Sequence, residues 1–227
     1  MGLIDLTFNG KSIKDFHVFC TGAGASTSPS RKYDTVEIDG RNGTIYRDKG
    51  SFSNVVVEYK CVIYGDMKDF ESLRAFINAQ SGYKRLEDSE RPYEYRMGVA
   101  QPIEPTIKAE NAVSFSMMFD CMPQRFLKEG EKTFTINQSG VLMNNTEFDA
   151  KPLIRVYDNG FITINNKTLN IVDLSGYIDI DCETMDCYKG SANMNANVSG
   201  DFPILKSGVN QITATGSIDI IPRWWTL

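Results

Sequence analysis

The sequence is poor in the residues on which most enzyme active sites depend. Its 227 residues include a single histidine, His17, so neither a histidine-rich metal site nor a Ser-His-Asp triad is indicated. The five cysteines are odd in number and widely spaced, which favours synthesis in a reducing compartment over a disulfide framework. Cys182 and Cys187 lie near each other, but a zinc ribbon needs a second pair. We therefore expect no catalytic residues, no bound metal and no cofactor.

Long apolar runs and an excess of basic residues are also missing. No apolar stretch approaches the roughly 20 residues of a membrane helix, and the first residues do not resemble a secretion signal, so we expect neither. Lysine and arginine number 24 against 29 aspartates and glutamates, giving a net charge of −5. This balance argues against a dedicated nucleic-acid binder, because binding phosphates needs a basic surface. The 41% hydrophobic content is typical of a folded globular protein.

Strand and hairpin signals fill the first half of the chain. Asn9-Gly10 predicts a tight turn, after which the segment 12–20 should continue as a strand with His17 on its outer face. A stronger hairpin is predicted around 40–43, because Asp-Gly and Asn-Gly dipeptides supply the positive φ angles that tight turns need. Further strands are expected at 54–64 and 112–119, where β-branched and aromatic residues are frequent.

One helix is expected, at residues 66–80. Asp66 is a suitable N-cap, and Phe70, Leu73 and Ile77 follow at helical spacing. We interpret this apolar stripe as core packing.

The second half of the chain shows no helix signal. From residue 133 onward, short alternating strands recur every 8–12 residues or so, among them 192–198, 208–214 and 217–221, which is typical of a β-sandwich. The charged segment 128–132 reads as a surface junction. We therefore predict two domains, at residues 1–132 and 133–227.

Two groups of residues in the second half have alternative interpretations. Asp179, Asp181 and Glu183 alternate along one predicted strand, with Cys182 on the core side. Such acids can bind calcium or form a glycosidase pair, but the solvated outer face of a half-buried strand is the simpler interpretation. The adjacent Trp224-Trp225 could form a sugar-binding platform, although such pairs more often pin a terminal segment onto the protein.

Several segments, in order along the chain, resemble the distal tail proteins of siphophages, which are bacteriophages with long, non-contractile tails. In the first half these segments are 8–16, 39–44 and 81–97. The segment 81–97 is the most specific, since it carries Leu86-Glu87-Asp88 followed by Pro92, Tyr93 and Tyr95-Arg96. In the second half they are 151–154, 178–183, 202–205, 208–210 and 222–224.

The resemblance implies a mainly β fold. An N-terminal β-rich, ring-forming domain with one α-helix would be followed by a C-terminal galectin-like β-sandwich. The last residues would be free to pack back on the N-terminal domain. The chain is short for the family and has no room for a long insertion in the sandwich.

The resemblance also implies a structural protein of the virion tail tip, made in the bacterial host cytoplasm. Its partners would be itself, in a hexameric ring, the tail tube protein, the tail-tip hub or tail-associated protein, and receptor-binding proteins. Tape-measure protein and DNA would pass through the ring without specific binding. As the candidate oligomer interface we take the predicted turn formed by Gly40, Arg41, Asn42 and Gly43.

Two other functions remain as alternatives at this point. A carbohydrate-binding module contacting the host surface would need tryptophan, tyrosine or histidine on a concave sheet. The sequence has no histidine beyond His17, and both tryptophans are terminal. A glycoside hydrolase would have to use the acids at 179–183.

Overall fold

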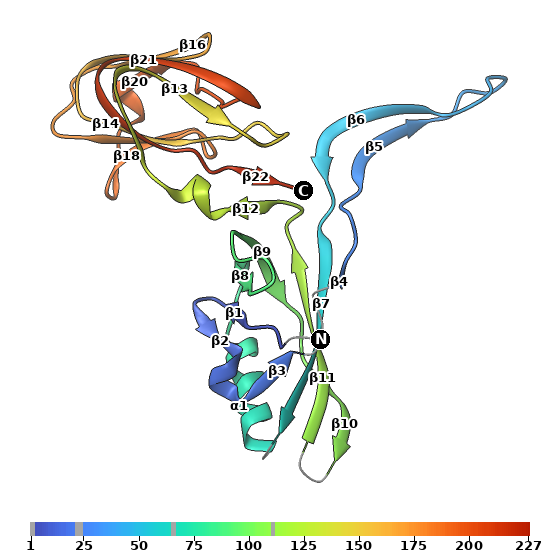
Figure 1. Cartoon of the computed structure of the whole chain (residues 1–227). Helices are drawn as coiled ribbons and strands as arrows, with labels where there is room; N and C mark the ends of the chain where they lie inside the picture. Colours follow the sequence, from blue (N-terminus) through green and yellow to red (C-terminus); the bar gives the residue numbers. More distant parts are fainter. Residues whose placement is uncertain (1–2, 21–24, 65–66, 110–111) are drawn as a thin grey trace. The chain divides into compact units, whose positions relative to one another are not determined.

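The computed structural model describes residues 3–20, 25–64, 67–109 and 112–227, and it divides the chain into two compact units. The first comprises Met1–Arg125 with Leu227, and the second comprises Phe126–Thr226. Strands dominate both units, and the described residues contain one α-helix, α1 (Met67–Asn78; Figure 1). The predicted class, mainly β with one helix, is confirmed. That each part of the chain folds independently stays a prediction.

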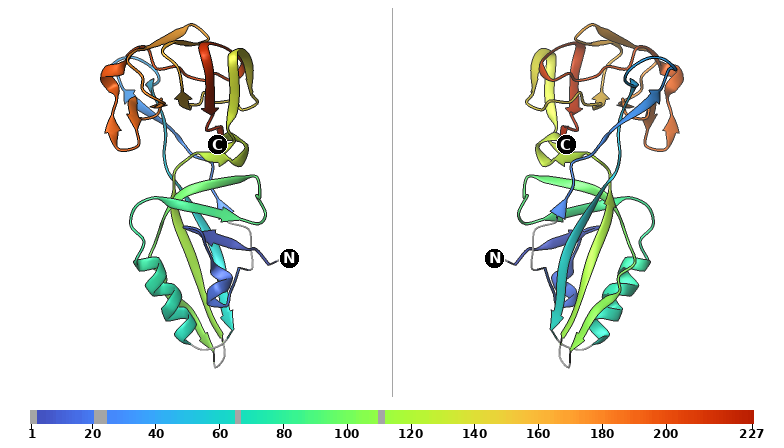
Figure 2. Two further views of the ribbon diagram at one scale, coloured as in Figure 1. Left: turned by 90° about the vertical axis from the view of Figure 1, so that its left-hand side faces the viewer. Right: turned by 90° about the vertical axis from the view of Figure 1, so that its right-hand side faces the viewer.

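The first unit is built on an antiparallel sheet with strand order β2-β1-β8-β9-β11-β7-β3, to which β10 adds beside β11 and β4 beside β7. Helix α1 lies beside the long strands of this sheet (Figure 2). The strands are β1 (Leu6–Phe8), β2 (Lys11–Ser12), β3 (Val18–Cys20), β4 (Ala25–Ser26), β7 (Val55–Tyr64), β8 (Lys84–Asp88), β9 (Glu94–Ala100), β10 (Pro105–Ala109) and β11 (Ala112–Cys121). Strands β7 and β11 pair along their whole length and form the longest ladder of the sheet.

The core of the first unit follows from the alternation in these strands. Every second residue of β7, from Val55 to Ile63, is buried, as expected when one face of a strand packs inward. Helix α1 covers this face with Phe70, Leu73 and Ile77, which confirms the predicted stripe. The proposed N-cap Asp66 lies outside the described residues.

The prediction of a strand over residues 12–20 was partly wrong. Residues Ile13–Phe16 form a 3-10 helix, and only Val18–Cys20 is a strand. The Ser12 side chain accepts a hydrogen bond from the backbone N–H of Lys14 at 3.2 Å. This local bond gives the backbone an alternative to the sheet ladder. His17 consequently ends the 3-10 turn in the left-handed region, with a φ of 55°, instead of lying in a strand.

A separate two-stranded sheet connects β4 to β7. It consists of β5 (Arg31–Val36) and β6 (Ile45–Phe52), which pair antiparallel (Figure 1). This is the hairpin predicted from the Asp-Gly and Asn-Gly dipeptides, and its strands are longer than the sequence pattern indicated. We refer to residues 31–52 as the arm.

The second unit is a β-sandwich whose curled sheet has the order β19-β18-β17-β14-β21-β15-β16-β20, with β13 also paired to β21. Its strands are β13 (Phe134–Asn144), β14 (Leu153–Val156), β15 (Gly160–Ile164), β16 (Lys167–Ile171), β17 (Ile178–Asp181), β18 (Asp186–Lys189), β19 (Ala192–Asn193), β20 (Val198–Gly200) and β21 (Gly208–Ile221). Two short strands, β12 (Arg125–Leu127) and β22 (Trp225–Thr226), complete the list. Alternating apolar residues, such as Ile154, Ile162 and Ile180, form its core.

Three predictions for the second unit were wrong in detail. The segments 208–214 and 217–221 form one continuous strand, β21, which pairs with β13 on both sides of an irregularity at the junction. The segment 192–198 contains short β19 and a 3-10 turn, Asn195–Asn197, in place of a strand. Strand β18 was not predicted. Among the described residues, no helix is long and apolar enough to cross a membrane.

Candidate functional site

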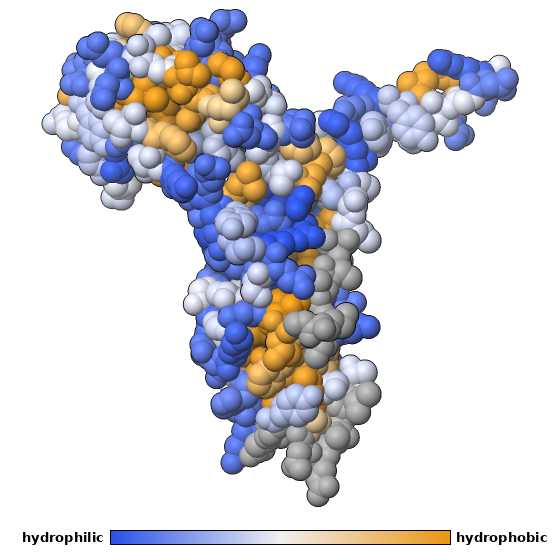
Figure 3. All heavy atoms as spheres, viewed as in Figure 1, coloured by the Kyte–Doolittle hydropathy of each residue, from blue (hydrophilic) through white to orange (hydrophobic). Residues whose placement is uncertain are grey.

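The arm lies outside the hydrophobic core of the first unit. Strand β5 is exposed along its whole length, and β6 is exposed except at its two ends. The arm contributes no residue to either hydrophobic core. Its surface nevertheless carries apolar side chains between hydrophilic ones (Figure 3). Val36, Ile38 and Tyr46 are 50%, 48% and 65% exposed.

Contacts within the arm are cross-strand and exposed. Arg31 and Asp48 are 2.9 Å apart, Lys49 and Asp34 are 2.5 Å apart, and the rings of Tyr33 and Tyr46 meet edge to face at 5.6 Å. Exposed ion pairs add little stability, and an isolated two-stranded hairpin is only marginally stable in water. Exposed apolar residues on such a ribbon are typical of a surface that another protein covers.

The four residues predicted as an oligomer interface lie together in the turn of the arm, between β5 and β6. All four are exposed. Gly40 and Gly43 have φ angles of +80° and +84°, which L-residues with side chains adopt at a cost. The turn is closed by a hydrogen bond from the Arg41 N–H to the Ile38 carbonyl at 3.0 Å. The structure explains why glycine is needed here, and the role of the turn in assembly stays a prediction.

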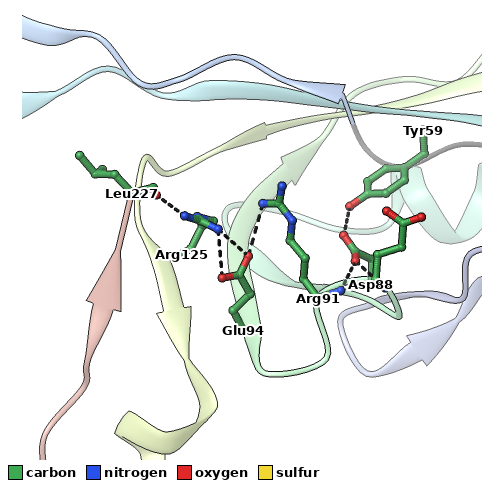
Figure 4. Close-up of polar contacts among 7 residues, drawn as sticks. Tyr59, Asp88, Arg91, Glu94, Arg125 and Leu227 are labelled. Atoms are coloured by element: carbon green, nitrogen blue, oxygen red, sulfur yellow. Dashed lines mark hydrogen bonds and ion pairs between the residues drawn. The ribbon is translucent and has the colours of Figure 1, made fainter. Parts of the chain in front are cut away.

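The segment 81–97, which carried the most specific part of the resemblance, forms the hairpin of β8 and β9. The sequence pattern had not predicted these strands, because the segment is charged. Asp88 holds the connecting turn, since one carboxylate oxygen accepts hydrogen bonds from the backbone N–H of Glu90 (3.0 Å) and Arg91 (2.9 Å). The other oxygen accepts the Tyr59 hydroxyl at 2.8 Å (Figure 4). Burial and the neighbouring Asp88 raise the pKa of Tyr59 far above its ordinary range.

Glu94, at the start of β9, joins two arginines. Its carboxylate lies 3.4 Å from Arg91 and accepts two hydrogen bonds from Arg125, at 3.1 and 3.2 Å (Figure 4). Arg125 also donates to the backbone carbonyl of Leu227. Asp88 and Glu94 therefore serve to hold the turn of this hairpin and the neighbouring Arg125 in place.

The acidic strand does not present the solvated outer face that was predicted. Asp179 and Asp181 are only 6% and 8% exposed. Arg155 binds Asp179 through two hydrogen bonds of 2.6 and 2.8 Å, and Arg223 binds Asp181 through two of 2.7 and 2.8 Å. The prediction was wrong because guanidinium groups, which match a carboxylate in shape and charge, cover these acids. Glu183 is exposed and lies 3.6 Å from Lys151.

These ion pairs are unsuited to glycoside hydrolysis. The hydrogen bond from Arg223 holds the pKa of Asp181 below its ordinary value. A glycosidase needs one carboxyl group with a raised pKa that can donate a proton near neutral pH. Among the described residues, no group of three or more histidines, cysteines or acids is placed to hold a metal ion.

The nearby cysteines are buried, as expected for Cys182. Burial raises the pKa of Cys182 to about 12 and that of Cys187 to about 11. Both are therefore thiols near neutral pH, whereas metal binding and nucleophilic attack require thiolates. His17 is exposed, as predicted, and its Nδ1 lies 3.1 Å from Asp69 on α1.

The two tryptophans pin the end of the chain within the second unit. Trp224 is buried in the core of that unit. Trp225 stacks on Phe148 with ring centroids 4.3 Å apart, and its indole N–H donates to the Asp149 carbonyl at 2.9 Å. A Cβ atom added to Gly130 would lie 2.2 Å from the Trp224 nitrogen, so glycine is required there. The pinning interpretation is confirmed, and Trp224 is not available as a sugar platform.

No family model and no curated protein matches the sequence, but solved structures resemble the fold over nearly its full length. The crystal structure of the phage SPP1 Dit protein, described as a paradigm of the hub adsorption apparatus in phages that infect Gram-positive bacteria, superimposes with a TM-score of 0.77 at 16% identity. The match covers 96% of this chain and 98% of that chain. Chains of the phage p2 baseplate in its activated conformation, with strontium or calcium, match with a TM-score of 0.53 at 10% and 9% identity. Each p2 match covers 96% of this chain and 97% of the other. This chain therefore has the fold of the SPP1 Dit protein and of a phage p2 baseplate subunit.

Proposed function

We propose that this protein is a distal tail protein of a bacteriophage with a long, non-contractile tail. It serves as a structural subunit and not as an enzyme. Six copies form a ring that joins the tail tube to the tail-tip hub or baseplate. The observation that carries this proposal is the likeness to the SPP1 Dit protein across both units, because a match over the whole chain is far more demanding than a match to one common β-sandwich.

The exposed surface of the arm supports the proposal of a ring. A closed ring requires each subunit to bind its neighbour through two different surfaces. An extended ribbon with exposed apolar side chains, outside its own core, is suited to lie on such a neighbouring surface. We assign to this interface the turn residues Gly40, Arg41, Asn42 and Gly43, together with the exposed arm side chains of Val36 and Tyr46.

The remaining partners follow from a position at the tail tip. The tail tube protein lies on one side of the ring, and the hub or tail-associated protein lies on the other, with receptor-binding proteins attached at the periphery. Tape-measure protein and DNA pass through the lumen. The net charge of −5 suits such a passage, because a negatively charged wall does not retain a polyanion.

Native mass spectrometry and negative-stain microscopy of the purified protein test the proposal directly. We expect particles of six subunits with a central opening, formed alone or on addition of the tail tube or hub protein. The ring is contradicted if the protein stays monomeric alone, with the tail tube protein and with the hub protein, even at high protein concentration.

Paired substitutions in the arm test the interface separately. Val36→Ser with Tyr46→Ser removes exposed apolar surface that stabilises neither core, so we expect an unchanged melting temperature and loss of the ring. Val141→Ser is the control, since Val141 is an apolar strand residue of comparable exposure, 62%, in the second unit. A ring that survives the double substitution refutes the interface without refuting the ring.

A further inference from the structure

Two cysteines of the first unit face each other across neighbouring strands. Cys20 on β3 is directly opposite Cys61 on β7, and the two Sγ atoms are 2.9 Å apart. Both residues are free thiols and both are buried. Neither takes part in the assembly function proposed above.

The backbone already meets the requirement for a covalent link. Residues directly opposite in an antiparallel pair have Cα atoms roughly 4.5–5.5 Å apart. Disulfides span Cα separations of about 4.4–6.8 Å. The Cα separation therefore allows the bond without displacement of either strand. The simpler alternative is a thiol pair joined only by a weak hydrogen bond, with the Cys61 thiol also donating to the Tyr59 carbonyl at 3.6 Å.

We propose that Cys20 and Cys61 are a modification site that closes to a disulfide when the protein meets a peroxide. One thiol, as its thiolate, attacks a peroxide oxygen and becomes a sulfenic acid, with release of the first water. The second sulfur then attacks the sulfenic sulfur, forms the S–S bond and releases a second water. In total, two thiols lose two protons and two electrons, and one molecule of hydrogen peroxide becomes two of water.

The position of β3 gives the oxidant a route to the buried sulfurs. Strand β3 has three residues and lies at the end of the strand order of the sheet, with a single bridge from Ile4 to Cys20 on its other side, so it can open without disrupting the long β7–β11 ladder. The hydrogen bond with Cys20 and burial raise the pKa of Cys61 far above its ordinary range. Oxidation should therefore be slow at neutral pH and faster at alkaline pH, where more thiolate forms.

The location of the pair gives the bond a consequence. Residues 21–60, between the two cysteines, contain the whole arm. A disulfide would tie together the segments that lead into and out of the arm, and it would restrict the unfolded chain. We expect the oxidised protein to melt at a higher temperature than the reduced protein.

The experiment is peroxide titration of the intact chain, followed by mass spectrometry. We expect a loss of about 2 Da, from two hydrogens, that a phosphine reductant reverses. Tryptic cleavage places Cys20 in peptide 15–31 and Cys61 in peptide 61–68, so the bond appears as a linked pair of these peptides. Cys182 and Cys187 share peptide 168–189, so a bond between them is distinguishable.

Cys20→Ala and Cys61→Ala should each abolish the mass loss and the gain in melting temperature, whereas Cys182→Ala should retain both. An unchanged mass, addition of oxygen atoms without loss of hydrogen, or linkage of other cysteines overturns the proposal. The peptide map of the unsubstituted protein decides the question even if a variant does not fold.

Discussion

Among single residues, Asp181 should be the most sensitive to a conservative change. Asp181→Asn removes the charge that holds Arg223 through two short hydrogen bonds at a largely buried position. Hydrogen bonds to charged groups contribute roughly 1.5–3 kcal/mol, so we expect a loss of about 2 kcal/mol in the free energy of unfolding, measured in urea. Glu183→Gln, two residues further at an exposed pair, should cost less than about 0.5 kcal/mol. Equal effects of the two substitutions would show that burial of the Asp181 pair is unimportant.

The same pair should produce a pH dependence of defined sign. The pKa of Asp181 is lowered in the folded state by the Arg223 hydrogen bond. A lowered pKa stabilises the fold above the unfolded-state value, about 3.9, and this contribution is lost as pH falls through the folded-state value. The stability difference between the unsubstituted protein and Asp181→Asn should thus be constant from pH 7 to about 5 and shrink below about pH 4. Urea unfolding at several pH values measures it, and a difference that is undiminished at pH 3 would contradict this origin.

At the scale of elements, the arm should be the first site of proteolysis in the free subunit. Its turn is exposed, and few contacts oppose its local opening. We expect brief trypsin treatment of monomer to cut after Arg41 and leave both units folded. In the assembled ring the same bond should be protected. The Arg41→Gln variant should lack the corresponding fragments, which identifies the cut, and equally fast cleavage in both states would exclude the turn from the interface.

Elements that depend on local signals could be predicted from the sequence. Helix α1 has an apolar stripe, and the hairpin turns have Asn-Gly and Asp-Gly dipeptides, so only neighbouring residues were needed. Strands β8 and β9 were missed because their charged side chains hide the alternation. Some of these side chains have partners far away in the sequence, such as Arg125 for Glu94.

The candidate sites show the same limit. The turn at 40–43 was found from its glycines, whereas the solvated face assigned to Asp179 and Asp181 was wrong. Their partners Arg155 and Arg223 come from other strands or from beyond β21, and no spacing rule connects them to the acids. The Cys20–Cys61 pair likewise depends on the register of β3 against β7, which the sequence does not reveal.

At the scale of the whole molecule, the start of the second unit can be tested with fragments. Leu127 packs against the second core and its N–H donates to the Trp224 carbonyl at 2.9 Å, while the Gly130 carbonyl accepts from Arg223 at 2.8 Å. A fragment of residues 133–227, the predicted domain, lacks these contacts, and a fragment of residues 126–227 keeps them. We expect both to give β-type circular dichroism spectra, with the longer melting about 5–10 °C higher because two hydrogen bonds and a leucine contact are retained. Equal melting temperatures would place the boundary at 133 after all.

The continuity of the arm with β7 has a mechanical consequence. Only Ser53 and Asn54 separate β6 from β7, so tension applied to the arm passes directly into β7, a long strand of the first unit. Strand β7 pairs with β11 along its whole length, and a pull along the strand axis would load these hydrogen bonds side by side in shear. Bonds loaded together must break together, whereas a strand peeled from one end loses them one at a time. A subunit pulled by its neighbour through the arm would thus resist with the strongest ladder of its sheet.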